Sequence, residues 1–309
     1  MNRYDPSQEP SLVDSLQYAR MVDQSAPAIG HWSSRILIPY LARPIYYLCP
    51  RHKPSWFPVF FALLCVNAFF VATAALFLFE IGQMLLLKPT TSLIAALLYL
   101  LNFGIVNFQL AGLVDSGETF FLILVTWFLL QDRWYMLPVL GILGALAKES
   151  FVPIATAFTV GWWLVDYHSR PNYISKIKWI ILMCVLGLTT VSSVRWIIGA
   201  GSTLLSTLVT EWKMQSFKIL LDRSFFYWFA WLLPLGLLRL HDFPTSWIVA
   251  SIFGLVTIVL LSVWAAAPGI NMWRYVFNLT GGLLSLSAAV FLENMLLSGD
   301  SKNRDKWLE

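Results

Sequence analysis

A few charged side chains interrupt this otherwise apolar chain, and chemistry can be centred on them. Several lie at the joints between apolar stretches: Asp115, Glu118, Lys148, Glu149 and Arg274. Ionisable groups beside a membrane are costly unless they are solvated, paired or used. A carboxylate in such a place can act as a general base, and a cation can stabilise a phosphate that develops negative charge.

Each of these residues also has a purely structural explanation. Asp115 can cap the helix that follows it by accepting that helix's free amide hydrogens. Lys148 and Glu149 can form a polar corner between two helices, and Arg274 can anchor the chain at the membrane interface between two aromatic residues. However, a cation at the start of a helix faces the unfavourable end of the helix dipole, and an anionic partner offsets that penalty. The residue types leave both explanations open.

The elements that must position these charges are predicted to be transmembrane helices. Of the 309 residues, 58% are hydrophobic and 12% are charged, and the mean hydropathy is +0.68. Soluble domains are much less apolar. Runs long enough to cross about 30 Å of hydrocarbon recur, without the alternation of a β-barrel. The sequence therefore predicts an all-α fold, a polytopic transmembrane helical bundle of about nine spans.

The chain divides into three predicted parts. Residues 1–56 form an external loop with a Pro-punctuated juxtamembrane segment that suits the membrane interface. Residues 57–298 form the transmembrane bundle, and residues 299–309 form a cytoplasmic tail. Within the bundle we expect helices near 57–80, 92–110, 119–131, 135–147, 151–166, 178–198, 225–239, 246–266 and 275–297.

Orientation follows from the Lys and Arg residues in the short loops, which favour the cytoplasm. The residues placed there are Lys88, Arg133, Arg170, Lys176, Lys178, Arg239, Lys302, Arg304 and Lys306. The front section and the segments 111–118, 148–150, 199–224 and 267–274 then lie outside. The protein is expected in the plasma (inner) membrane as a multi-pass protein with its active face extracytoplasmic.

Several fragments, taken in order, resemble the GT-C superfamily of membrane glycosyltransferases, which includes mannosyltransferases and aminoarabinose transferases. Asp14-Ser-Leu-Gln-Tyr18-Ala-Arg-Met and then Ser34-Arg-Ile-Leu-Ile-Pro-Tyr-Leu-Ala42 look like the first external loop and juxtamembrane helix of that superfamily. Val114-Asp115 and Gly144-Ala-Leu-Ala-Lys-Glu-Ser150 are similar to its central motifs, and Arg274 matches its late external arginine. The resemblance covers most of the chain.

The resemblance implies an inverting transfer of a sugar from a polyprenyl-phosphate donor to an acceptor hydroxyl. Asp14 would be the catalytic base. The residues implied to bind the donor phosphate are Arg274, Lys148 and Arg35. The residues implied to contact or orient the acceptor are Asp115, Glu149, Asp23 and Tyr18.

The expected partners are membrane lipid and a polyprenyl-phosphate sugar, and no nucleic acid is expected because Lys and Arg are scattered along the chain. No cofactor is expected beyond the lipid-linked sugar, which is a co-substrate. The four histidines are far apart in the sequence, which argues against a metal site.

Two other functions remain open. A transporter subunit would use intramembrane charges as a substrate path. A catalytically silent membrane scaffold would keep the fold without the chemistry. The resemblance also implies a spanning helix ahead of the catalytic loop, where this sequence has none. A start codon upstream of Met1, a truncated chain, or a divergent, inactive member would each explain this difference.

Overall fold

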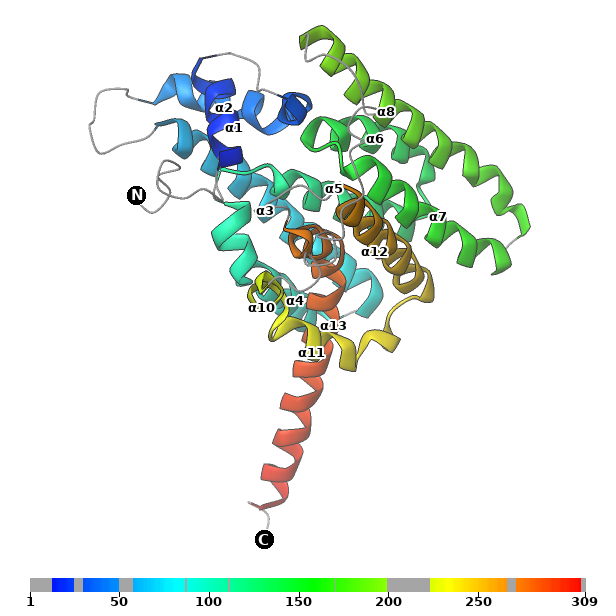
Figure 1. Cartoon of the computed structure of the whole chain (residues 1–309). Coiled ribbons are helices and arrows are strands. Elements are labelled where there is room, and N and C mark those ends of the chain that lie inside the picture. The colour runs from blue at the N-terminus through cyan, green and yellow to red at the C-terminus, as the bar shows by residue number, and fades with distance from the viewer. Residues whose placement is uncertain are drawn as a thin grey trace.

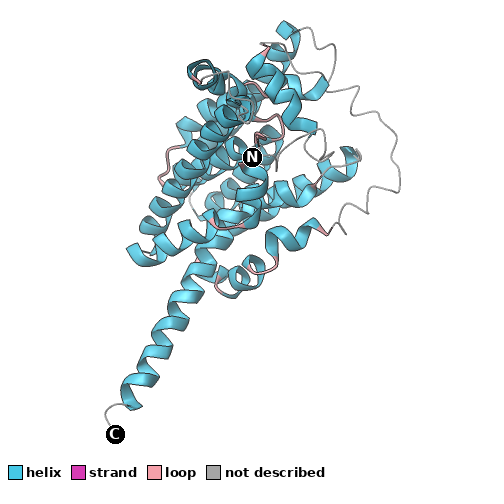
Figure 2. Cartoon of the chain, turned by 90° about the vertical axis from the view of Figure 1, so that its left-hand side faces the viewer, coloured by secondary structure: helices cyan, strands magenta, loops and turns pink. Residues whose placement is uncertain are grey.

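The computed structural model describes residues 13–24, 30–49, 58–86, 88–110, 112–169, 171–198, 223–265 and 271–306. Throughout these ranges the regular elements are helices, and no strand occurs in them (Figure 2). Four segments are long and apolar enough to cross a membrane: Pro58–Leu86, Ile174–Ile198, Thr245–Val263 and Met272–Leu296. The predicted all-α class is confirmed, and the four candidate membrane-spanning helices support the prediction of a membrane protein.

Twelve α-helices of the described residues build the fold (Figure 1). They are α1 (Val13–Asp23), α2 (Leu37–Leu48), α3 (Pro58–Leu86), α4 (Pro89–Leu100), α5 (Asp115–Leu130), α6 (Leu137–Ala147), α7 (Phe151–Ser169), α8 (Ile177–Ile198), α10 (Ser224–Phe229), α11 (Leu232–Leu238), α12 (Thr245–Ala265) and α13 (Met272–Lys306). Each of the nine predicted segments contains helix. The predicted external loop 199–224 lies almost wholly outside the described residues.

Two predicted helices are interrupted, which corrects their boundaries. The segment predicted over 92–110 ends as α4 at Leu100 and resumes as a π-helical turn, Ile105–Gln109. Asn102 causes this break by donating to the Trp228 carbonyl and accepting from the Gly104 amide. The segment predicted over 225–239 divides into α10 and α11 because the ring of Pro234 excludes the helical carbonyl four residues before it.

Helix α13 is the centre of the bundle. Within its apolar window 83% of the residues are buried, against 22% for α8, so α8 lies at the periphery of the bundle. Helix α13 packs against α4, α5, α11 and α12. It continues to Lys306, beyond the predicted end near 297, and Figure 1 shows its last part projecting away from the other helices.

Small residues let α6 and α8 approach closely. A Cβ atom on Gly141 would lie 2.5 Å from the backbone oxygen of Met183, so only glycine fits there without a backbone shift. We expect Gly141→Ala to lower the free energy of unfolding by about 1–3 kcal/mol through overpacking. Thermal unfolding in detergent measures this effect. Val139→Ala on the exposed face of α6 is the control, and equal losses in both variants would contradict the packing explanation.

The front section is anchored to the bundle through α1 and α2. Helix α2 buries Ile38 and Ala42 and leaves Tyr40, Leu41 and Leu48 exposed. An exposed apolar face of this kind fits the predicted interfacial segment. The Arg43 guanidinium donates to the Met21 carbonyl from 2.9 and 3.0 Å, and this contact holds α1 against α2. Residues 50–56, the remainder of the predicted segment, are outside the described ranges.

Candidate functional site

The beginning of α5 and the corner between α6 and α7 together bury three charged side chains. Lys148 Nζ lies 2.5 Å from Asp115 Oδ1 and 2.9 Å from Glu118 Oε2. None of the three side chains is more than 2% exposed. Helix α5 begins at Asp115 and has no side-chain cap, so the capping explanation of Asp115 is wrong, and its carboxylate accepts from Lys148 instead.

Helix α13 adds a second cation and an amide to the same two carboxylates. Arg274 Nε lies 3.3 Å from Asp115 Oδ1, and the Asn278 amide donates to Glu118 Oε2 from 2.8 Å. Positions four residues apart share one helix face, so Arg274 and Asn278 both point at α5. Two buried carboxylates thus face two cations, which is the balance that buried charges require.

A second ion pair joins the front section to the same corner. Arg35 donates to both Glu149 oxygens, from 2.5 and 2.8 Å, and to the Tyr18 hydroxyl from 2.8 Å. Burial, the largest single cause, would lower the pKa of Arg35, but the charge and hydrogen bonds of Glu149, together with Tyr18, hold that pKa above its usual value. Burial raises the pKa of Tyr18, so Tyr18 is a neutral phenol beside a permanent guanidinium.

Asp14 differs from the other acidic side chains of this region. No cation among the described residues contacts its carboxylate. It is half-buried, one helical turn before Tyr18 on α1, and it has no hydrogen bond or ion pair within the described ranges. Its charge acts on the Arg274 guanidinium and adds to the rise in the Tyr18 pKa. Asp14 therefore faces the cluster without being paired in it.

The structure brings most of the predicted site residues together. Six of them make direct contacts in two neighbouring groups, which are Tyr18, Arg35 and Glu149, and Asp115, Lys148 and Arg274. Asp23 is not joined to them. It lies five residues after Tyr18 on α1, about 7.5 Å along the helix axis, and its carboxylate accepts a hydrogen bond from the Tyr46 hydroxyl of α2.

Sequence reasoning missed other members of the cluster. They are Asn278, Ser150, Tyr275 and Gln109, and Glu118 was noted as a charge at a helix joint but given no role in the site. No role was expected for Asn278. Its Asn-Leu-Thr sequence matches a glycosylation site, but the match lies inside a predicted apolar helix and was interpreted as chance. The signal that identifies it is a polar residue inside an apolar helix, which needs a buried partner. Gln109 extends the same network, donating to Asn278 Oδ1 from 3.2 Å.

An apolar cavity of about 650 Å³ begins beside the cluster. Glu149, Ser150 and Tyr275 contribute to its lining, and most of the remainder comes from apolar residues of α7, α8 and α12. Lys148 Nζ lies 3.8 Å from the centre of the Tyr275 ring, so this ring separates the buried cation from the cavity. A ligand with an anionic head and a long apolar chain fits this combination of charge and cavity.

The predicted cations differ in how free they are to bind such a head. Lys148 and Arg35 are enclosed and hydrogen-bonded to carboxylates. The Arg274 side chain is 13% exposed, more than either of the other two, although its Nε lies 3.3 Å from Asp115 Oδ1. Arg274 is therefore the cation best placed to bind a ligand anion. Comparisons with protein-family models, curated proteins and solved structures find no match to this chain.

Proposed function

We propose that this chain is an integral membrane glycosyltransferase of the GT-C type, a bundle of about nine spans that transfers a sugar from a polyprenyl-phosphate donor to an acceptor hydroxyl on the extracytoplasmic face. One observation carries the proposal: the cluster of paired charges directly borders the apolar cavity through Glu149, Ser150 and Tyr275. A polyprenyl phosphate combines the anionic head and the apolar chain that these two features require.

In the proposed reaction, Asp14 takes the proton of the acceptor hydroxyl. The acceptor oxygen forms a bond to the anomeric carbon of the sugar, and the bond from that carbon to the phosphate oxygen breaks. The leaving group is the polyprenyl phosphate, whose additional negative charge Arg274 stabilises. Lys148 and Arg35 act on this step by holding the carboxylates around Arg274, since their own contacts are to Asp115, Glu118 and Glu149.

The test of this proposal is the Arg274→Ala variant with a polyprenyl-phosphate sugar as donor. Hydrogen bonds to charged groups contribute about 1.5–3 kcal/mol, so kcat/KM for the donor is expected to fall about 10- to 100-fold. Initial rates at varied donor concentration measure this change. Arg274→Lys, which keeps the charge, is expected to retain part of the activity.

Arg239→Ala is the control, because Arg239 is 38% exposed and pairs only loosely with Asp242, at 4.0 Å. Its donor dependence is expected to equal that of the unmodified protein. If Arg274→Ala also leaves the donor dependence unchanged, the assigned phosphate role is wrong.

The second candidate function is a catalytically silent membrane scaffold. It is favoured by the complete pairing of Lys148 and Arg35 with carboxylates of the chain itself. A scaffold of this kind transfers no sugar from any polyprenyl-phosphate donor, so a wild-type protein that is folded but inactive with a panel of such donors supports it over the transferase.

A further inference from the structure

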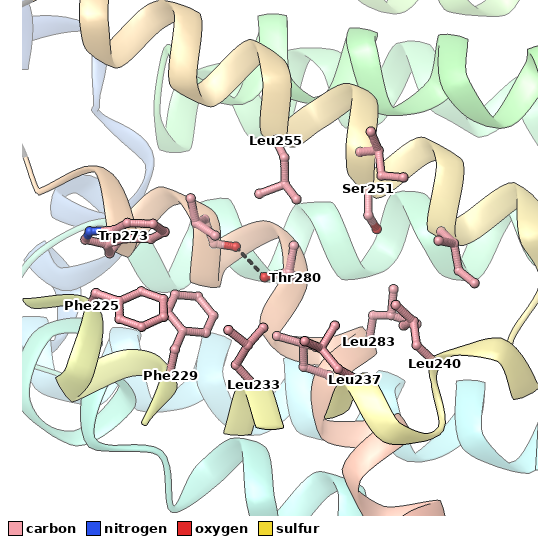
Figure 3. Close-up of a pocket in the computed structure, with 14 residues that line it drawn as sticks. Phe225, Phe229, Leu233, Leu237, Leu240, Ser251, Leu255, Trp273, Thr280 and Leu283 are labelled. Carbon is pink, nitrogen blue, oxygen red and sulfur yellow. Dashed lines mark hydrogen bonds between the residues drawn. The ribbon is translucent and has the colours of Figure 1, made fainter. Parts of the chain in front are cut away.

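A second groove runs along the other side of α13. It has a volume of about 340 Å³, and its lining residues come from α10, α11, α12 and α13. Phe225, Phe229 and Trp273 gather at one end, while Leu240 and Ser251 lie toward the other (Figure 3). From Trp273 to Leu284 the groove follows eleven residues of α13, about 16 Å of helix.

Two buried polar atoms in this lining have no hydrogen-bond partner among the described residues. They are the hydroxyl of Ser251 and the indole N–H of Trp273. Ser251 is 4% exposed, and Figure 3 shows its oxygen directed into the groove. By contrast, the nearby Thr280 hydroxyl donates to the Val276 carbonyl from 2.8 Å. Leaving a buried donor unpaired costs about 1–3 kcal/mol, so a ligand that carries oxygen atoms as well as hydrocarbon fits this groove.

Three consecutive residues connect the two cavities. Trp273 lines the groove along α13, Tyr275 lines the larger cavity, and Arg274 stands between them beside Asp115. Both cavities therefore begin at the charged cluster, and helices α12 and α13 contribute to the walls of both. Two apolar chains can lie in the membrane with their polar heads meeting at Arg274.

We propose that the acceptor is itself a membrane lipid, whose chain lies in the groove of α10, α11, α12 and α13 while the donor chain lies in the larger cavity. This assignment rests on the proposed transferase function. The volumes indicate which lipid occupies which cavity. The longer polyprenyl chain requires the cavity of about 650 Å³, and a shorter acyl chain fits the groove of about 340 Å³. The Trp273 N–H lies at the end of the groove next to Arg274, where it can donate to an ester oxygen of the acceptor lipid, while the Ser251 hydroxyl lies further along the acyl chain.

Photolabelling of the full chain in phosphatidylcholine vesicles tests this proposal. One probe is a diacylglycerol with a diazirine on one acyl chain, which has a free hydroxyl, and the other is a polyprenyl phosphate with a diazirine on its chain. Helix α12 offers matched variants: Ser251→Phe fills the groove, and Ser262→Phe fills the larger cavity. Both serines are buried, at 4% and 5% exposure.

The expected result is a crossed pattern. Ser251→Phe should reduce diacylglycerol labelling about tenfold and leave polyprenyl labelling intact, and Ser262→Phe should do the reverse. Excess unlabelled polyprenyl phosphate should not displace the diacylglycerol probe. Leu283→Trp, which fills the groove from α13, gives a second measurement if Ser251→Phe fails to fold.

Two results overturn the lipid-acceptor proposal. In the first, the diacylglycerol probe labels all lipid-facing helices, and neither Ser251→Phe nor Leu283→Trp changes that labelling. In the second, polyprenyl phosphate displaces the diacylglycerol probe. Failure of the transferase function looks different. In that case the polyprenyl probe does not label the larger cavity of the unmodified protein, whatever the diacylglycerol probe does.

Discussion

Replacing Asp14 with Asn is expected to reduce sugar transfer by about 10²- to 10⁴-fold, the contribution typical of a general base. The amide has the shape of the carboxylate but cannot accept the proton of the acceptor hydroxyl. Because Asp14 has no hydrogen bond or ion pair within the described ranges, its replacement should leave expression and the unfolding temperature unchanged. Transfer from a polyprenyl-phosphate sugar and thermal unfolding in detergent, measured on the same preparation, check both statements.

Asp132→Asn is the matched control for this variant. Asp132 is 51% exposed and pairs with Lys176, and its backbone φ of 58° is one that Asn tolerates well. The control should retain full transfer activity. Full activity in Asp14→Asn would remove the proposed base, and a parallel loss of folding would show that Asp14 has a structural role instead.

The helices were largely predictable from the sequence because each apolar run must satisfy its own backbone hydrogen bonds inside a membrane. The interruptions were not predictable in the same way. The break after α4 depends on Asn102 and Gly104 meeting Trp228, and Asn102 and Trp228 lie 126 positions apart in the chain. Local periodicity contains no information about a contact of that range. The break at Pro234, in contrast, has a local cause that the sequence displays.

Most residues of the site could be predicted from the sequence, but the ion pairs that they form with one another could not. Charges at helix joints are conspicuous in an apolar chain, which is why Asp115, Lys148 and Arg274 were identified. Which carboxylate binds which cation depends on how α5, the corner after α6 and α13 meet. Lys148 and Glu149 are adjacent in sequence, but Lys148 pairs with Asp115 and Glu118, and Glu149 pairs with Arg35. The two neighbours therefore belong to separate groups of internal ion pairs, and their ligand-binding roles stay predictions.

Replacing Lys148 with Met is expected to lower the free energy of unfolding by about 3–5 kcal/mol, because it leaves two buried carboxylates with one cation. Asp115 and Glu118 are at most 2% exposed, so water cannot replace the lost ammonium group. Thermal unfolding in detergent measures the loss. The matched control is Lys176→Met: Lys176 also contacts a carboxylate, at 3.1 Å from Asp132, but Asp132 is exposed and Lys176 is only half-buried, so the pair should contribute about 0–1 kcal/mol.

A double variant separates the structural role of Lys148 from a role in donor binding. Asp115→Asn combined with Lys148→Met removes one negative charge along with the positive one, so it should recover much of the stability lost in the single variant. Such a recovery would show that the stability lost in Lys148→Met comes from an uncompensated buried carboxylate. If Lys148→Met instead unfolds at the temperature of the unmodified protein and loses only donor binding, Lys148 acts on the phosphate directly. The enclosure of its ammonium group by Asp115, Glu118 and the Tyr275 ring argues for the structural role.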